Sequence, residues 1–132
     1  MKEKYILTAS QEDYLKQIYV LGMKQEEVRV TDVAKQLGLS KPSVNRAINT
    51  LREGEFLVHE HYGTLHLTPK GEKAANNIYE SYKVIRRFLI EVLEVEEEVA
   101  DKEADLMEHN ISKSTKKKWK KYMKKERKNK NK

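Results

Sequence analysis

The chain has 132 residues, of which 38% are hydrophobic and 36% are charged, so it has room for one domain or for one small domain with an appendage. It contains no cysteine, which excludes disulfides and thiolate metal ligands. The N-terminus lacks an apolar signal-like core, and no run of residues approaches membrane-spanning length. We therefore expect a cytoplasmic protein with no membrane partner.

The net charge of +6 is unevenly distributed along the chain. Residues 1–72 are neutral overall, residues 73–110 carry a net charge of −5, and residues 111–132 carry +11. The high isoelectric point therefore comes from the C-terminal segment. It is not by itself evidence that the front half binds nucleic acid.

The first predicted elements are two helices with a short strand between them. Ser10 can cap a helix that runs to about Met23, and the sequence VRV at residues 28–30 has strand character. Thr31 then starts a second helix. Gly38 is expected to end that helix, because glycine adopts the left-handed conformation at little cost.

A third helix and a hairpin follow. Ser40 is placed to cap the helix, and Pro42 falls in its first turn, where a missing N–H does no harm. Residues 56–68 contain two β-prone runs around Tyr62 and Gly63, which is typical of a hairpin.

The rest of the chain is expected to be helical. Thr68 and Pro69 form a strong helix start, and the helix they open is predicted to reach about Leu93. A further helix is predicted from Glu96 to about His109, and a last one begins after Ser112 or Ser114.

This order of elements is that of a winged helix-turn-helix followed by helices. We predict a mainly α fold with three parts: a winged helix-turn-helix DNA-binding domain at 1–72, a helical dimerisation region at 73–123 and a basic disordered tail at 124–132. The apolar stripe from Ala75 to Val92, together with Trp119 and Tyr122, is too large to stay exposed on so small a domain. We therefore expect a homodimer.

The third helix carries the predicted function. Its outward residues are small or polar donors and acceptors, which suits a helix whose N-terminal turn enters the major groove of double-stranded DNA. The expected DNA-binding residues are Thr31, Ser40, Lys41, Pro42, Ser43, Asn45, Arg46, Asn49, Tyr62 and Thr64. A merely solvated helix face is the alternative, but the correct spacing of both caps and the turn glycine favours DNA binding.

The chain resembles the diphtheria toxin repressor and manganese transport regulator family, in its short form without an extra C-terminal domain. The resemblance covers roughly residues 7–125 and is carried by LTASQEDYLKQIYVL, VTDVAKQLGLSKPSVNRAINTL, HLTPKGEKAANNIYESY and ADLMEHNIS. It implies a dimeric winged-helix repressor of a palindromic operator, whose affinity for DNA is raised by Mn(II) or Fe(II).

The resemblance also implies a set of metal ligands. The family's ligand on the first helix falls on Asp13, and its cluster on the later helix falls on Asp105, Glu108 and His109. The last three lie at positions i, i+3 and i+4, so they project from one helix face. Three carboxylates and one imidazole suit Mn(II) or Fe(II). The alternative is an exposed acidic helix face with an incidental histidine.

The family's second metal position is altered in this chain. Tyr82 stands where the family usually has a histidine, and Lys16 stands where manganese-sensing members have a carboxylate. Arg86 replaces a glutamate of some members. Lys16 and Arg86 would repel a second cation, so the sequence predicts at most one ion per chain. The two basic residues are also able to supply fixed positive charge to the same carboxylates.

Two other interpretations stay open. One is a winged-helix regulator that is independent of metal or senses another effector. The other is an architectural or RNA-associated protein that binds through its basic tail. Catalysis is not expected, because the four histidines form no nucleophile–base arrangement in the sequence.

Overall fold

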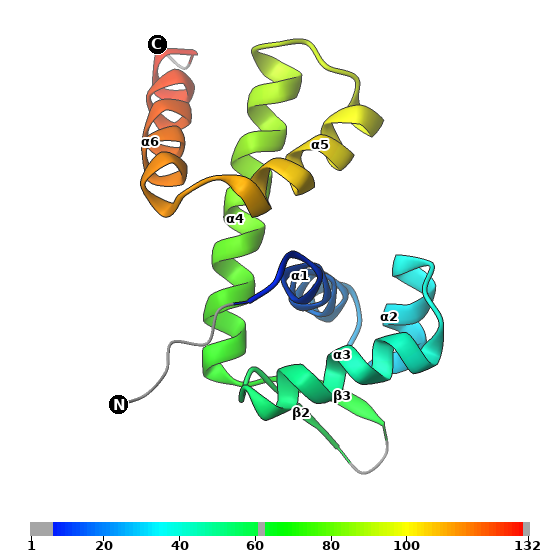
Figure 1. The fold of residues 1–132 in the computed structure, drawn as a ribbon. Helices are drawn as coiled ribbons and strands as arrows, with labels where there is room; N and C mark the ends of the chain where they lie inside the picture. Colours follow the sequence, from blue (N-terminus) through cyan, green and yellow to red (C-terminus); the bar gives the residue numbers. More distant parts are fainter. Residues whose placement is uncertain (1–6, 61–62, 131–132) are drawn as a thin grey trace. The chain divides into compact units, whose positions relative to one another are not determined.

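The computed structural model describes residues 7–60 and 63–130. The chain divides into two compact units, Met1–Asn77 and Ile78–Lys132, which are described separately below. The elements in chain order are α1 (Ala9–Lys24), β1 (Val28–Arg29), α2 (Val30–Leu37), α3 (Lys41–Glu53), β2 (Leu57–His59), β3 (Thr64–Leu67), α4 (Pro69–Glu91), α5 (Glu97–Asn110) and α6 (Lys113–Lys130). Figure 1 shows them. The predicted mainly α fold with a winged helix-turn-helix is confirmed.

The first helix begins two residues earlier than the sequence predicts. Thr8 is the N-cap in place of Ser10, and its hydroxyl oxygen accepts a hydrogen bond of 3.1 Å from the Gln11 backbone N–H. The Gln11 side-chain oxygen in turn accepts one of 2.9 Å from the Thr8 backbone N–H. This reciprocal pair satisfies two otherwise unpaired backbone donors and places the start of the helix at Ala9.

The second helix also begins earlier than predicted. Its N-cap is Arg29, whose backbone N–H donates to the Asp32 carboxylate at 2.9 Å, so Thr31 lies inside the first turn and is not the cap. The predicted end at Gly38 is confirmed by its left-handed backbone, with φ of 65°. The predicted cap of α3 is also confirmed, because the Ser40 hydroxyl accepts from the Ser43 backbone N–H at 3.4 Å.

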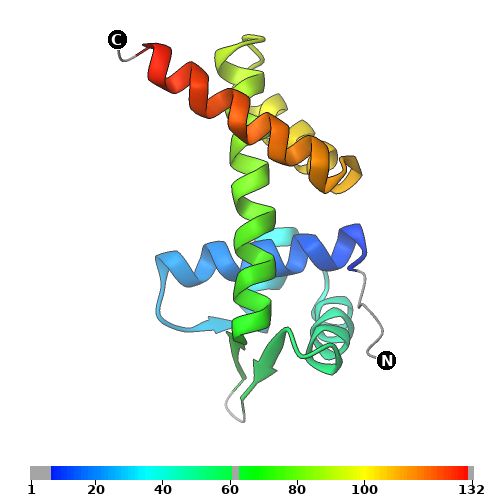
Figure 2. The ribbon, with the colours of Figure 1, turned by 90° about the vertical axis from the view of Figure 1, so that its left-hand side faces the viewer.

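The sheet is antiparallel with strand order β1–β3–β2. Val28 pairs with Leu65, and Leu57 pairs with Leu67, so the short strand after α1 closes one edge of the predicted hairpin. Gly63 has φ of 82°, which supplies the left-handed residue of the turn. Figure 2 shows the hairpin extending away from α1 within the N-terminal unit.

The N-terminal unit is held together by one hydrophobic core to which every one of its helices and strands contributes. This core supports the exposed face of α3. Its buried members are Tyr14, Leu15, Ile18, Leu21, Val28, Val33, Ala34, Val44, Ile48, Leu51, Phe56, Leu57, Leu65 and Ala75.

The C-terminal unit has a smaller core between the later turns of α4, helix α5 and helix α6. Ile85 and Leu89 of α4 pack with Ala100 and Ala104 of α5. Trp119 of α6 meets Phe88 of α4 edge to face, with ring centroids 5.1 Å apart. Trp119, which is expected from the sequence to contribute to a dimer, thus packs against its own chain.

The last helix is longer than the sequence predicts. Helix α6 continues to Lys130, so residues 124–130 are helical and not the expected disordered tail. Buried Met123 anchors this part of the helix, and its backbone oxygen accepts a 2.8 Å hydrogen bond from the Arg87 guanidinium. Lysine and arginine are also good helix formers, so a segment rich in them can be helical although it is highly charged.

Within the described ranges, no helix is both long enough and apolar enough to cross a membrane.

Gly71 fixes the start of α4 by a close approach to the backbone at Phe56. A Cβ atom added at Gly71 would lie 1.8 Å from the Phe56 carbonyl oxygen, whereas one added at Gly22 of α1 would meet no atom within 4 Å. We expect Gly71→Ala to lower the free energy of unfolding by about 1–3 kcal/mol or more, because the backbone must shift. Gly22→Ala, the matched control, should raise it by about 0.5–1 kcal/mol, since alanine favours a helix. Thermal and urea denaturation measure both. Equal stability of the two variants would contradict the close packing.

Candidate functional site

The start of α3 presents a polar surface above a buried stripe. Val44, Ile48 and Leu51 are buried, and this spacing of four and three residues turns the other side of the helix to solvent. The exposed residues on that side are Lys41, Pro42, Asn45, Arg46 and Asn49. Five of the predicted DNA-binding residues therefore lie together on one accessible helix face.

A cleft of about 310 Å³ joins this surface to the start of α2 and to the hairpin. It is lined by Arg29, Val30, Thr31, Lys41, Asn45, His59 and Gly63. The cleft brings together three predicted residues, Thr31, Lys41 and Asn45. It also adds Arg29, which the sequence analysis did not single out although it is a basic residue directly before the first turn of α2.

The remaining predicted DNA-binding residues differ in their placement. The Ser40 hydroxyl donates to the Ser43 hydroxyl at 3.0 Å, so both side chains take part in the start of α3. Thr64 is only 7% exposed and pairs with Arg29 across the sheet, so its side chain lies apart from the surface. Tyr62 lies outside the described residues.

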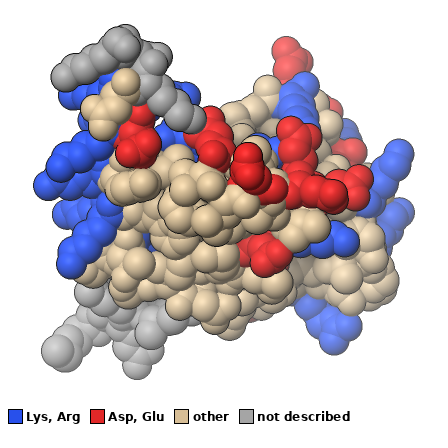
Figure 3. All heavy atoms as spheres, turned by 90° about the horizontal axis from the view of Figure 1, so that it is seen from above, with Lys and Arg blue, Asp and Glu red and all other residues tan. Residues whose placement is uncertain are grey.

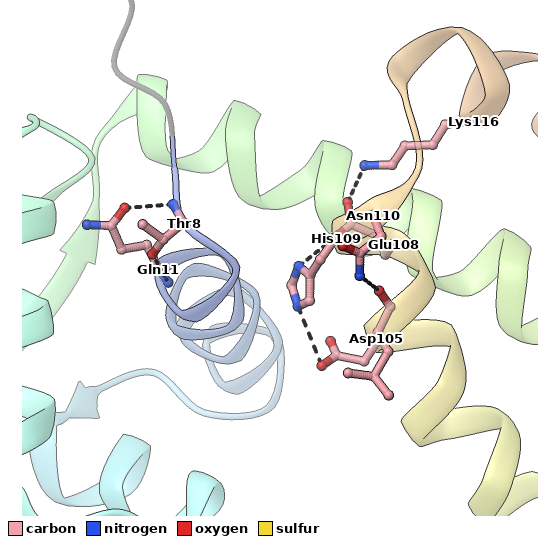
Figure 4. Close-up of polar contacts among 8 residues, drawn as sticks. Thr8, Gln11, Asp105, Glu108, His109, Asn110 and Lys116 are labelled. Atoms are coloured by element: carbon pink, nitrogen blue, oxygen red, sulfur yellow. Dashed lines mark hydrogen bonds and ion pairs between the residues drawn. The ribbon is translucent and has the colours of Figure 1, made fainter.

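Three of the four predicted metal ligands lie together on α5. His109 Nε2 is 3.6 Å from an Asp105 carboxylate oxygen, and His109 Nδ1 is 3.2 Å from Glu108 Oε2. Figure 4 shows the three side chains on one part of the helix, with Lys116 of α6 reaching Glu108. Asp13, the fourth, lies in the second turn of α1 in the N-terminal unit and is partly exposed.

Glu108 is the most unusual member of this group because its carboxylate is buried. Its side chain is 2% exposed, and its Oε1 accepts a hydrogen bond of 2.6 Å from the Lys116 ammonium. Oε2 is buried without a hydrogen-bond partner in the described part of the chain. A buried carboxylate oxygen of this kind is costly unless it binds a donor or a cation. The donor set of Asp105, Glu108 and His109 therefore fits a divalent ion.

Two of the residues at the altered second metal position, Tyr82 and Arg86, bind a neighbouring carboxylate. Arg86 and Tyr82 of α4 both bind the carboxylate of Asp101, Arg86 through an ion pair and the Tyr82 hydroxyl by donating over 3.3 Å. Burial, and then the charge of Asp101 and the hydrogen bond to it, raise the pKa of Tyr82 to about 12. The hydrogen bond to Asp101 also raises the pKa of Arg86. Tyr82 therefore stays a neutral donor and Arg86 a cation at any ordinary pH.

Several large apolar side chains are exposed on α5 and in the turn that follows α4. Leu106 is 61% exposed, and Val92, Leu93 and Val99 are also exposed. On the face drawn in Figure 3, Asp and Glu side chains gather over the centre and right, and Lys and Arg side chains lie at both the left and the right edge. Leu106 and Val99, seven residues apart on α5, lie on one side of that helix and are available for a protein–protein contact.

Comparison with known protein families gives two adjoining matches. Residues 6–65 match the family described as iron dependent repressor, N-terminal DNA binding domain. Residues 68–131 match iron dependent repressor, metal binding and dimerisation domain.

Individual relatives agree with these matches. The chain is 35% identical over 105 residues to the HTH-type transcriptional regulator MntR of Geobacillus kaustophilus, covering 80% of this chain and 74% of that protein. Among solved structures, the metal-dependent transcriptional regulator MtsR superposes with a TM-score of 0.81 at 27% identity, covering 89% of this chain and 55% of the other. The manganese regulator SloR gives a TM-score of 0.78 at 26% identity, with coverages of 86% and 53%. The chain thus spans about half the length of these two solved structures.

Proposed function

Because the chain belongs to the family of iron dependent repressors, we propose that it is a dimeric repressor whose N-terminal unit binds a palindromic site in double-stranded DNA. A divalent metal ion is its cofactor, and the family is one of transcription regulators and not of enzymes. We expect a cytoplasmic location, because a bacterial-type regulator must meet its DNA there.

The observation that carries the metal assignment is the unsatisfied Oε2 of Glu108 beside His109. We propose one Mn(II) or Fe(II) ion per chain, with Asp105, Glu108 and His109 as ligands. Asp13 enters this ligand set from the family resemblance. His109 must be neutral to bind the ion, so metal binding is expected to weaken in acid. The Arg86 guanidinium is paired with Asp101, one helical turn from Asp105. Its positive charge disfavours a second ion.

The DNA assignment rests on the exposed face of α3 and the cleft beside it. Asn45 and Arg46 lie early in the helix, where side chains reach base edges in the major groove. Thr31, Lys41 and Arg29 line or border the cleft and suit phosphate oxygens, which lie to the side of the groove. Homodimerisation through the exposed apolar residues of α5 would give the protein two copies of α3, one for each half of a palindrome.

Arg46→Ala tests base recognition. The DNA sequence for this test would first be selected from a random pool by the wild-type protein in the presence of Mn(II), so that no operator need be known beforehand. We expect a loss of about 1–3 kcal/mol on the selected sequence and a much smaller loss on random DNA. Fluorescence anisotropy measures both affinities. An equal loss on both DNAs would reduce Arg46 to a phosphate contact. Binding that survives Arg46→Ala but is lost on removing residues 124–132 would favour the basic tail as the binding element.

His109→Ala tests the metal assignment. Calorimetric titration of the wild-type protein with Mn(II) should give one ion per chain, and the variant should lose measurable binding, because the imidazole is a ligand. Asn110→Ala, a substitution at the exposed neighbouring residue, is the matched control and should titrate as the wild type does. Two ions per wild-type chain would refute the claim that the altered second position excludes a second ion. No uptake, combined with full DNA affinity in chelator, would favour a metal-independent regulator.

A further inference from the structure

Lys116 is placed by the fold against a buried carboxylate. The Ser112 hydroxyl accepts from the Thr115 backbone N–H at 3.2 Å and thereby fixes the first turn of α6. Trp119 and Met123, three and seven residues after Lys116, pack into the unit. Lys116 therefore lies on the packed face of α6, and its side chain is only 18% exposed, whereas the neighbouring Lys117 is exposed.

The partner of Lys116 is the proposed metal ligand Glu108. The ammonium donates to Oε1 over 2.6 Å, which leaves Oε2 as the oxygen without a hydrogen bond. A buried carboxylate without a counter-charge is strongly unfavourable, so the ammonium stabilises Glu108 when no metal ion is present. The same contact occupies one of the two oxygens that a bidentate metal ligand would need.

We propose that Lys116 is an internal competitor of the metal ion for Glu108, and that it sets how tightly the protein binds its metal. This inference rests on the proposed metal function of the Asp105, Glu108 and His109 cluster. If the ammonium stays on Oε1 when an ion binds Oε2, the two cations repel each other across one carboxylate. If the ammonium leaves, the ion must replace a short, charge-assisted hydrogen bond. Lys116 weakens metal binding in both cases.

The contact differs in its consequences from an ordinary structural ion pair. A structural pair contributes stability whether or not metal is present, and its loss would leave the metal affinity unchanged or lower it. A competitor stabilises the metal-free protein more than the metal-bound one, so its loss lowers stability without metal and raises metal affinity. The two roles therefore predict opposite changes in the dissociation constant for Mn(II).

The test compares Lys116→Met with the wild-type protein, since methionine keeps much of the side-chain volume and removes the charge. We expect Mn(II) to bind about tenfold more tightly by calorimetry, because one unit of positive charge has left the ligand group. The melting temperature of the metal-free variant should fall, and its rise on adding saturating Mn(II) should exceed that of the wild type. Lys116→Arg should retain a wild-type affinity to within about threefold, because it keeps the charge.

Two further variants make the result decisive. Lys117→Met removes an exposed charge from the same helix and should leave both metal readouts unchanged. Lys116→Gln keeps a hydrogen-bond donor for Glu108 and should also tighten Mn(II) binding, which keeps the test open if the methionine variant folds poorly.

An unchanged or weaker Mn(II) affinity in Lys116→Met and Lys116→Gln, with normal wild-type binding, would overturn the role of Lys116 alone. Binding in the variants but not in the wild type would support it in its strongest form. Absence of binding in all of them would overturn both this inference and the proposed metal function.

Discussion

The C-terminal unit depends on one constraint, the need to neutralise the carboxylate of Glu108, which its packing buries. Glu108 is 2% exposed and lies next to His109, which is 6% exposed. Asp101, one turn from Asp105, is paired with Arg86. The acidic α5 is thus bordered by cations from both neighbouring helices, Arg86 of α4 and Lys116 of α6. Among the described residues, Oε2 is the Glu108 oxygen that accepts no hydrogen bond, and we propose that the metal ion binds there.

The N-terminal unit depends instead on apolar packing, so the exposed side chains of α3 take no part in its core. Gly71 brings α4 against the carbonyl of Phe56, and the buried stripe of α3 turns Asn45 and Arg46 outward. The same helix α4 continues into the C-terminal unit, where its later turns carry Tyr82 and Arg86. One helix therefore takes part in the cores of both units.

Much of this could be predicted from the sequence because the signals were local. Gly38 and Ser40 fix the turn before α3 by backbone geometry alone, and the family resemblance, which the comparisons confirm, was carried by contiguous motifs. The contacts that could not be predicted join residues whose meeting depends on tertiary packing. In the sequence, Lys116 is one of many lysines of a basic segment, and only the packing of Trp119 and Met123 shows that it lies on the packed face of α6. Likewise, the cleft role of Arg29 appears only when β1 pairs with β3.

The central claim is that the metal site and the DNA-reading surface are coupled, and a thermodynamic cycle tests it most directly. Mn(II) affinity would be measured with and without the selected DNA, and DNA affinity with and without Mn(II). The account predicts that each ligand tightens the other by the same factor, about 5- to 150-fold. Unchanged affinities in both arms, with Mn(II) bound, would show that the ion has no part in controlling DNA binding.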